Sequence, residues 1–382
     1  MPVTLRELRP VHVIGVGMHR YQFPSETPYI HMGLTALRAA LTDAGLEFQA
    51  IESAHVGTTG CGMAAGRVMF RHIGSTGLAV QQIENASASG SFAFANACLE
   101  VASGVRDVAL AIGVDKYGDQ KRAVTKEGIN RLSDTASVPL VKYALLCRTL
   151  AREKGLSAED LARVGWKNHN NASTNPFAQF QKPRTLEQVL NSTRVAGDLT
   201  SLQCTPRGEG AAAAIVVSDD AMRSFGLNAA RAVRVLSSTA GSETLPQGRE
   251  PGSVIAARDV ALRTYREAGI TAQDLDVVEL HDAFSIEEIL YTEAFGLCPE
   301  GHGHHYLREG RSAIGGECAV NSSGGLIAQG HPLGPTGVGQ IHEIVRQLRG
   351  ENGDRQQANA RIGMAHMIGL GSVAIAHVLR KD

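Results

Sequence analysis

The chain has 382 residues, of which 43% are hydrophobic and 20% charged, and its formal net charge is -1. This composition is that of a globular protein, and the near-zero charge gives no general attraction to nucleic acid or to an anionic membrane. A chain of this length exceeds one ordinary hydrophobic core, so we expect two compact halves. The 42 glycines and the low aromatic content of 5% favour tight turns and closely packed helices.

Cysteine usage and the two ends of the sequence indicate a compartment. The cysteines show neither the Cys-x-x-Cys spacing of a zinc site nor the density of a disulfide framework. They are Cys61, Cys98, Cys147, Cys204, Cys298 and Cys318. The first residues do not form a signal peptide, no apolar run reaches membrane-spanning length, and the last residues are not a peroxisomal address. We therefore expect reduced thiols in a cytoplasmic protein.

Hydrophobic periodicity predicts alternating strands and helices in the first part of the chain. The predicted elements are a strand at 11–17, a helix at 27–46, a strand at 54–59, a helix within 83–104 and a strand at 107–114. The run 107–114 is continuously apolar, as in a strand buried on both faces. The glycine-rich loop 60–66 does not fit a dinucleotide-binding fingerprint, because its glycine spacing is off by one. The order β-α-β-α-β predicts an α/β fold.

The rest of the chain predicts an excursion and then a second half. Residues 115–205 are more polar and contain two helical stretches, which we interpret as a lid-like subdomain. The later predicted elements are strands at 208–217, 234–239, 275–280 and 373–379, and helices at 141–154, 157–167, 254–268, 286–295 and 337–348. The similar element order indicates a duplication, with halves at 1–228 and 229–382.

The stretch 83–104 runs from a polar turn through four small residues, Ser87 to Gly90, into a helix that Gly104 ends. Its predicted buried face consists of Phe92, Ala95, Cys98, Leu99 and Ala102. A helix start has a partial positive charge and free N–H donors, so it favours an anion or a nucleophile losing a proton. A small-residue helix start packed tightly under a loop fits the pattern equally well.

Three histidine segments follow. His281 comes directly after a predicted strand, where ligands bind in open α/β sheets. His331 lies in a glycine-rich turn before a helix, and His366 lies on a predicted glycine-rich turn at 364–372. Each histidine alone is more often structural than catalytic. The cluster His302, His304 and His305 fits no defined zinc motif, and we interpret it as a surface loop without metal.

Together, these four segments resemble the four active-site loops of thiolases, in the same order and over nearly the whole chain. Ser87 stands where the motif Asn-x-Cys-x-Ser-Gly has its nucleophilic cysteine. Residues 281–284 are similar to the His-Asp-Cys-Phe variant of sterol-carrier-protein-type thiolases, and 330–337 to the family's Gly-His-Pro-Leu-Gly-Ala-Thr-Gly. His366 lies where other thiolases have a Cys-x-Gly loop. Further matching stretches are 113–117, 167–172, 204–210 and 296–301.

The resemblance implies an α/β thiolase fold: two similar βαβαβ-type halves in αβαβα layers, with an inserted lid at about 115–205. It also implies roles for residues. Ser87 would take the acyl group, His331 would activate it and help bind an enolate oxygen, and His281 would complete that oxyanion site. The backbone N–H groups of Ser87 and Gly369 would hold the acyl oxygen, and His366 is a weaker candidate for proton transfer.

The same resemblance implies ligands and partners. Coenzyme A would be a substrate, and no metal or redox cofactor is implied. Candidate coenzyme A contacts are Arg71, Lys167, His169 and Arg207. The family's dimer implies a homodimer or a dimer of dimers. Some thiolase-like chains pair with a small zinc-ribbon/OB-fold protein, so such a partner is a further expectation, and neither nucleic acid nor membrane is expected.

Two departures from the family pattern affect the predicted chemistry. A thiol has a pKa of ~8.5, whereas a hydroxyl is far more basic, so Ser87 would need general-base help from His331. Ala283 also stands where the sterol-carrier type offers a cysteine for acid/base work.

Four interpretations remain open at this point. We expect an acyl-CoA C-acyltransferase catalysing Claisen condensation or thiolytic cleavage, with the cysteine either exchanged for serine to trap a complex or naturally a serine. A thiolase-fold aldolase or lyase would cleave a CoA ester without a covalent intermediate. A non-catalytic subunit would serve a zinc-ribbon/OB-fold partner, although such a scaffold would not need His281 and His331.

Overall fold

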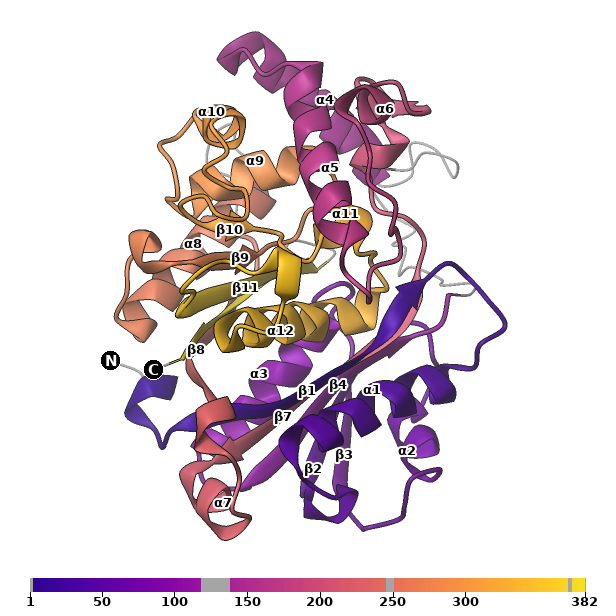
Figure 1. Cartoon of the computed structure of the whole chain (residues 1–382), viewed down its shortest axis with the longest axis vertical. Coiled ribbons are helices and arrows are strands. Elements are labelled where there is room, and N and C mark those ends of the chain that lie inside the picture. The colour runs from indigo at the N-terminus through magenta and orange to yellow at the C-terminus, as the bar shows by residue number, and fades with distance from the viewer. Residues whose placement is uncertain (1–2, 118–137, 245–250, 370–372, 382) are drawn as a thin grey trace.

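The computed structural model describes residues 3–117, 138–244, 251–369 and 373–381 (Figure 1). The N-terminal half contains β1 (Val11–Gln22), α1 (Tyr29–Ala44), β2 (Ser53–Gly57), α2 (Ala65–Phe70), β3 (Ala79–Ile83), α3 (Ser89–Ala102), β4 (Val108–Asp115), β7 (Glu209–Ser218) and α7 (Asp219–Ser224). The excursion between β4 and β7 contains α4 (Val138–Lys154), α5 (Ala158–Ser173), α6 (Leu186–Leu190), β5 (Arg194–Ala196) and β6 (Leu199–Thr200).

The C-terminal half follows with a matching set of strands. Its elements are β8 (Val233–Gly241), α8 (Gly252–Ala268), β9 (Val277–Glu279), α9 (Ser285–Ala294), α10 (Gly303–Arg308), β10 (Ala319–Val320), α11 (Gly325–Ala328), α12 (Leu333–Arg349), β11 (Ile362–Gly369) and β12 (Val373–Arg380). Among the described residues, none of the helices combines the length and the apolar character needed to cross a bilayer.

Two five-stranded sheets with the same topology form the centre of the molecule. The ten strands form one hydrogen-bonded series in which β1 of the first half neighbours β8 of the second; read from its outer edge inward, the first half has the order β3-β2-β4-β7-β1 and the second half β10-β9-β11-β12-β8. When the five sheet strands of each half are numbered by their order in the sequence, both halves have the order 3-2-4-5-1. In each, the second strand pairs in parallel with the third and fourth, and the fifth pairs antiparallel with the fourth and first. A short antiparallel contact of His12 and Val13 with Arg234 and Val233 joins the sheets.

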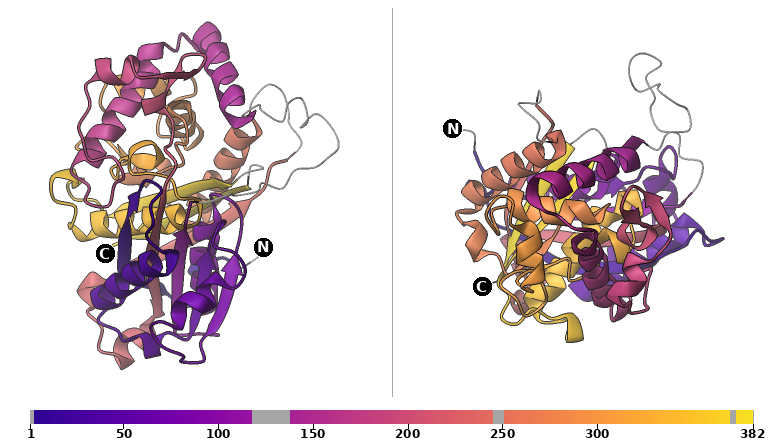
Figure 2. Two further views of the ribbon diagram at one scale, coloured as in Figure 1. Left: turned by 90° about the vertical axis from the view of Figure 1, so that its right-hand side faces the viewer. Right: turned by 90° about the horizontal axis from the view of Figure 1, so that it is seen from above.

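Helices and sheets alternate in five layers (Figures 1 and 2). Helix α1 covers the outer face of the first sheet and α8 the outer face of the second. Helices α3 and α12 lie between the sheets and contact strands of both. The predicted thiolase-type αβαβα arrangement is therefore confirmed. The middle layer matters most for function, because α3 follows the loop with Ser87 and α12 follows the loop with His331.

The inserted segment packs on the second half of the chain. Helix α5 contacts α9, α10 and α11, and Figure 1 shows α4, α5 and α6 beside them. The backbone N–H of Thr205 donates to the carbonyl of Ala283, and Asn168 Nδ2 donates to Asp282 at 2.8 Å. The insertion is thus anchored to the residues that follow His281.

The structure corrects two details of the sequence analysis. Strand β3 and helix α2 were not predicted, because α2 has only six residues and β3 is an edge strand whose residues are largely exposed. The predicted buried face of α3 was only partly right: Cys98 and Ala102 are buried and Phe92 and Ala95 partly buried, but Leu99 is 56% exposed, and Phe94 and Val101, which were not predicted, are fully buried. Nearly every residue of α3 is apolar or small, so the sequence does not mark which side faces the core.

Candidate active site

Ser87 lies in the short connection between the end of β3 and the start of α3. Ala86, directly before it, has a φ of 48°, a left-handed conformation that non-glycine residues rarely adopt. The buried Ser89 side chain braces this turn by accepting from the Asn85 N–H at 2.9 Å and donating to the Ala86 carbonyl at 2.6 Å. The turn therefore fixes the position of Ser87 at the opening of the helix.

His331 joins Ser87 to Thr336 through both ring nitrogens. Its Nε2 lies 3.0 Å from Ser87 Oγ, and its Nδ1 lies 2.9 Å from Thr336 Oγ1. The Thr336 hydroxyl donates its single proton to the Pro332 carbonyl at 2.5 Å, so it must accept from an Nδ1–H of His331. We infer that Nε2 holds a lone pair and accepts the hydroxyl proton of Ser87.

The environment of His331 keeps its imidazole neutral. Burial lowers the pKa of His331 well below its usual value, and the nearby ring of His281 lowers it further. The ring is only 9% exposed, as is Ser87. A neutral imidazole with its lone pair on a serine hydroxyl is the arrangement of a general base with a nucleophile.

Glycines explain how the two loops approach so closely. A Cβ on Gly90 would lie 2.4 Å from the carbonyl oxygen of Gly334, and a Cβ on Gly337 would lie 2.6 Å from the backbone N of Ser91. These contacts are with backbone, which cannot move aside as a flexible side chain does. The first turns of α3 and α12 can therefore touch only because these positions lack a side chain.

Asp115, at the end of β4, fixes the start of α12. Its buried carboxylate accepts the Gly334 N–H at 2.6 Å, the Gly60 N–H at 2.9 Å, and hydrogen bonds from Thr58 and Thr59. Burial raises the pKa of Asp115, and these donors oppose the rise. The carboxylate thus ties the loop after β2 to the helix that carries Thr336.

His281 lies two residues after β9, as predicted, with its ring nearly perpendicular to that of His331 and 5.4 Å from it between centroids. Its Nδ1 is 3.5 Å from Oε2 of the buried Glu287. The other oxygen of Glu287 accepts hydrogen bonds from Tyr143 at 2.6 Å and Tyr291 at 3.1 Å. Helix α4 of the insertion therefore contributes, through Tyr143, to the surroundings of His281.

The segment around His366 differs from its prediction. His366 lies in the middle of β11 rather than on a turn, is fully buried, and packs edge-on against Tyr291 and Phe295. Its placement argues against proton transfer to a substrate. Of the residues that suggested a turn, Gly369 is the last residue of β11, and Gly371 and Ser372 lie outside the described residues. Gly369 ends β11 against the Ser87 loop, because a Cβ there would lie 2.5 Å from the Asn85 carbonyl.

Two candidate coenzyme A contacts lie inside the protein. Lys167 is only 6% exposed, and its ammonium contacts Glu288 at 3.0 Å, Asn168 at 2.7 Å and the Val320 carbonyl at 2.5 Å. Its ammonium is therefore already held by two hydrogen bonds and an ion pair inside the protein. His169 is fully buried against the ring of Phe180, and burial lowers its pKa to about 4. Neither side chain is placed to meet a phosphate, which corrects both predictions.

The other two candidate coenzyme A contacts, Arg71 and Arg207, lie in different parts of the molecule. Arg71 is exposed and directly follows α2. At the end of α2, the ring of Phe70 lies against the ring of Phe48, and Phe48 comes shortly before the amino end of β2. Arg71 therefore lies toward the end of the strands opposite Ser87, which argues against its predicted role. Arg207 is exposed, and its carbonyl accepts from Gln179, the side chain that approaches Gly330 next to His331. Arg207 is thus the candidate that lies near the site.

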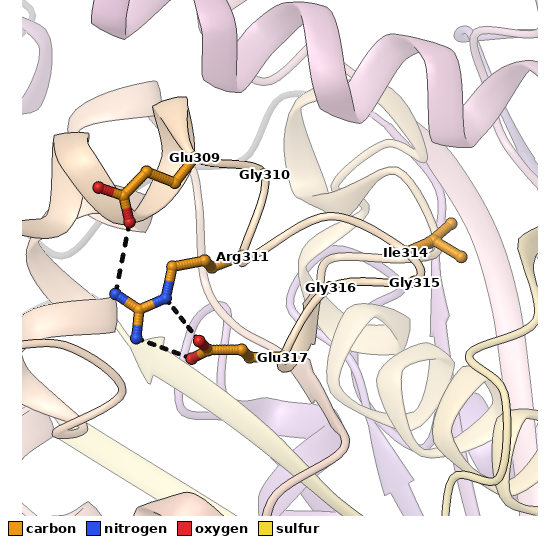
Figure 3. A pocket seen from close by; sticks show the side chains of 7 residues that line it. All are labelled: Glu309, Gly310, Arg311, Ile314, Gly315, Gly316 and Glu317. Atoms are coloured by element: carbon orange, nitrogen blue, oxygen red, sulfur yellow. Dashed lines mark hydrogen bonds and ion pairs between the residues drawn. The ribbon is translucent and has the colours of Figure 1, made fainter.

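Other polar features lie apart from this site. A surface depression of about 540 Å³ contains Arg311, whose guanidinium is paired with Glu317 at 2.8 Å and Glu309 at 3.6 Å (Figure 3). None of the predicted site residues lines it. Within the described part of the chain, no group of three or more histidine, cysteine or acidic side chains is arranged to hold a metal, and this includes the histidines of residues 302–305.

Two family comparisons cover most of the sequence. Residues 16–219 match "Thiolase, N-terminal domain", and residues 237–381 match "Thiolase C-terminal domain-like". The chain belongs to the thiolase family. This thiolase is 35% identical over 398 residues to human "Sterol carrier protein 2", a match that covers 98% of this chain and 72% of that protein. The predicted resemblance to the sterol-carrier type is therefore confirmed.

Further relatives are similar in sequence or in fold. An "Acetyl-CoA acetyltransferase" of Methanothermobacter thermautotrophicus is 36% identical over 385 residues, covering 98% of this thiolase and 100% of that protein. Among solved structures, the "Ltp2-ChsH2(DUF35) aldolase" has a TM-score of 0.85 at 22% identity, with 98% of each chain covered. Human mitochondrial 3-ketoacyl-CoA thiolase has a TM-score of 0.74 at 18% identity, with 100% of each chain covered. These structural similarities concern the fold alone.

Sequence analysis missed four residues that shape the site. Thr336 follows His331 by five residues in the sequence Gly-Pro-Thr-Gly, and a hydroxyl so close to a candidate base was a usable signal. Asp115 was visible as a lone acid at the end of a continuously apolar strand. Glu287 and Tyr143 gave no comparable signal, because their contact joins residues that are 144 positions apart.

Proposed function

We propose that this thiolase is an acyl-CoA C-acyltransferase that condenses acyl groups or cleaves 3-ketoacyl-CoA through an acyl group on Ser87. The observation that carries the proposal is the hydrogen-bonded series from Ser87 Oγ through His331 to Thr336. In the first step His331 Nε2 takes the hydroxyl proton, and Oγ attacks the thioester carbon of an acyl-CoA in condensation or the 3-keto carbon of a 3-ketoacyl-CoA in cleavage. The proton then passes from His331 to the departing thiolate or enolate.

The second half-reaction uses the same two histidines. In condensation, His331 Nε2, unprotonated again, takes a proton from the α-carbon of a second acyl-CoA, and the new Nε2–H of His331 together with a water bound by His281 holds the enolate oxygen. The enolate carbon then attacks the acyl carbon, Ser87 Oγ leaves, and the proton passes from His331 to that oxygen. In cleavage, His331 Nε2 takes the thiol proton of coenzyme A while the sulfur attacks the acyl carbon, and the departing Ser87 Oγ receives that proton from His331. His281 has its Nδ1 near the Glu287 carboxylate, which supports an N–H at Nδ1 and orients the ring. The backbone N–H groups of Ser87 and Gly369 are our candidates for binding the acyl oxygen.

The serine is expected to make this enzyme slow in thiolysis. Since a hydroxyl is a weaker nucleophile than a thiolate, Ser87→Cys should raise thiolytic cleavage of a short or medium 3-ketoacyl-CoA by about 100-fold or more. His331→Ala should abolish turnover in either background and leave the melting temperature nearly unchanged. Turnover that survives His331→Ala would contradict the assigned base.

Two alternatives make different predictions. An aldolase without a covalent intermediate would cleave its substrate equally well after Ser87→Ala. A non-catalytic subunit would show no turnover with any variant until a zinc-ribbon/OB-fold partner is added. The pairing of a serine with a neutral histidine favours the acyl-enzyme proposal over both, because neither alternative uses it.

We also propose that the enzyme is a homodimer or a dimer of dimers. Strand β3 is the edge of the sheet, and within the described residues no further strand pairs with it. Its backbone groups are therefore available to a second copy. The neighbouring helix α3 exposes Leu99, a large apolar side chain. Light scattering of the purified protein tests this part of the proposal.

A further inference from the structure

We propose that the same site hydrolyses acyl-CoA thioesters to coenzyme A and a carboxylic acid, with water accepting the acyl group from Ser87. This inference rests on the proposed function, because the acyl-Ser87 ester is the shared intermediate. It adds water as a second acceptor of the acyl group and a carboxylic acid as a second product. The structural basis is an oxygen nucleophile held by a neutral histidine whose tautomer is fixed by Thr336.

The acyl group on this enzyme is held as an oxygen ester, since the cysteines on the neighbouring elements do not provide a thiolate. Cys98, in α3, is fully buried, and burial raises the pKa of its thiol. Cys204 lies in the segment that pairs with Phe284, but its thiol donates to the Thr200 carbonyl, and burial raises its pKa to about 12. Both remain thiols at neutral pH, so neither replaces Ser87.

Exchanging sulfur for oxygen changes which acceptor takes the acyl group. An oxygen ester is more stable than a thioester, because the ester oxygen donates electrons to the carbonyl more strongly than sulfur does. Return of the acyl group from Ser87 to the thiol of coenzyme A is therefore uphill. Thiols and carbanions also attack oxygen esters much more slowly than thioesters, whereas hydroxide attacks the two classes at similar rates. The exchange thus favours water over both thiol and carbon acceptors.

The surroundings of Ser87 suit a water acceptor. Ser87 and His331 are each 9% exposed and His281 6%, whereas His366 behind them is fully enclosed. A molecule as small as water can therefore reach the edge of these rings, and His331 Nε2 lies beside Ser87 Oγ, where the ester would form. Ala283 offers only a methyl group in the same loop, so it supplies no base for removing the α-proton of a carbon acceptor.

The hydrolytic step balances without any other reactant. The oxygen of water attacks the acyl carbon while His331 Nε2 takes a proton from it. The tetrahedral intermediate then breaks its bond to Ser87 Oγ, and His331 returns the proton to that oxygen. Acylation has already released coenzyme A as a thiol with the original proton of Ser87. The net reaction is acyl-CoA plus water to carboxylic acid plus coenzyme A.

The test uses octanoyl-CoA, which has no 3-keto group and so cannot undergo thiolytic cleavage. The full-length protein, Ser87→Cys and Ser87→Ala are each incubated with octanoyl-CoA and pantetheine as a competing thiol. Octanoic acid and octanoyl-pantetheine are then quantified. We expect the serine enzyme to form acid over many turnovers, and the ratio of acid to octanoyl-pantetheine to fall at least about tenfold in Ser87→Cys. Ser87→Ala should form neither product above background.

The outcomes separate this inference from the proposed function. Octanoyl-Ser87 that forms but yields acid no faster than the Ser87→Ala background would overturn hydrolysis and leave acyl transfer intact. An equal product ratio for serine and cysteine would also overturn it, since the argument rests on the oxygen ester. Absence of any acyl adduct on Ser87, together with absence of both products, would contradict the proposed function itself.

Discussion

The Nε2 atom of His331 lies 3.0 Å from Oγ of Ser87, although 244 residues separate them in the chain. Each residue lies just before a helix of the middle layer, Ser87 before α3 and His331 before α12. The two helices approach each other through Gly90, Gly334 and Gly337. The contact between Ser87 and His331 therefore depends on the close packing of α3 against α12 as much as on the two side chains.

The hydroxyl of Thr336 is expected to set the tautomer of His331. In Thr336→Val the Nδ1–H loses its acceptor, so the ring can present a protonated Nε2 to Ser87 instead of a lone pair. Acylation of Ser87 should then slow by about 100-fold, the size expected for general-base catalysis. Thr336→Ser retains the hydroxyl and should retain most of the rate. Equal rates for the valine and serine variants would contradict this role.

The close contact of α3 with α12 should not tolerate a methyl group at residue 90. Gly90→Ala would place a Cβ against the Gly334 carbonyl, so the helices must separate at a cost of about 1–3 kcal/mol in the free energy of unfolding. Activity should fall more than stability does, because His331 moves with α12. Gly252→Ala is the matched control, since its Cβ would meet only the Glu243 side chain at 3.5 Å. Chemical denaturation and CoA-release assays measure both effects.

The dependence of activity on pH follows from the environment of His331. A base must be unprotonated, so activity is lost as pH falls through the pKa of His331. Burial lowers this pKa well below the usual value, so the rate of acylation should stay level from pH 8 to below 6.5. A pre-steady-state measurement of CoA release across this range tests it. A loss of rate centred near pH 6.5 would contradict this prediction, because it would mean that the pKa of His331 is that of an exposed histidine.

Stability should also decline in mild acid, with His342 as one identifiable contributor. Burial lowers the pKa of His342 to about 3, so between pH 3 and 6.5 the unfolded chain binds a proton that the folded protein does not. The free energy of unfolding therefore decreases as pH falls below 6.5, by up to about 1.4 kcal/mol per pH unit for such a histidine. This slope is proportional to the number of protons that the chain takes up on unfolding, and His342→Gln should lower that number by about one. An unchanged slope in urea denaturation from pH 7.5 to 5 would contradict the assignment.

Much of the architecture could be predicted from the sequence because central strands such as β4 and β7 are buried on both faces. Runs such as 107–114 are continuously apolar, and the glycines that end helices are local signals. His281 and His331 could be placed for the same reason, since each follows a well-marked strand or precedes a helix. The resemblance to thiolases then supplied the pairing of Ser87 with His331, which local patterns do not encode.

The errors also have physical reasons. Whether Lys167 faces solvent or a buried acid depends on Glu288, which lies more than a hundred residues away in the chain. His366 was placed on a turn because the glycines after it were given more weight than the apolar run that contains it. The role of Glu287 beside His281 depends on Tyr143, from the inserted segment. Long-range polar contacts of this kind carry no local sequence signal.

The most direct test of the account is whether Ser87 becomes acylated. The wild-type protein is mixed with octanoyl-CoA, quenched in acid within seconds, and analysed by intact mass and by peptide mapping. The account predicts a mass increase equal to one octanoyl group, located on Ser87 and absent from Ser87→Ala and His331→Ala. Turnover without any adduct, or an adduct that persists in Ser87→Ala, would contradict the assignment of Ser87 as the acyl-carrying residue.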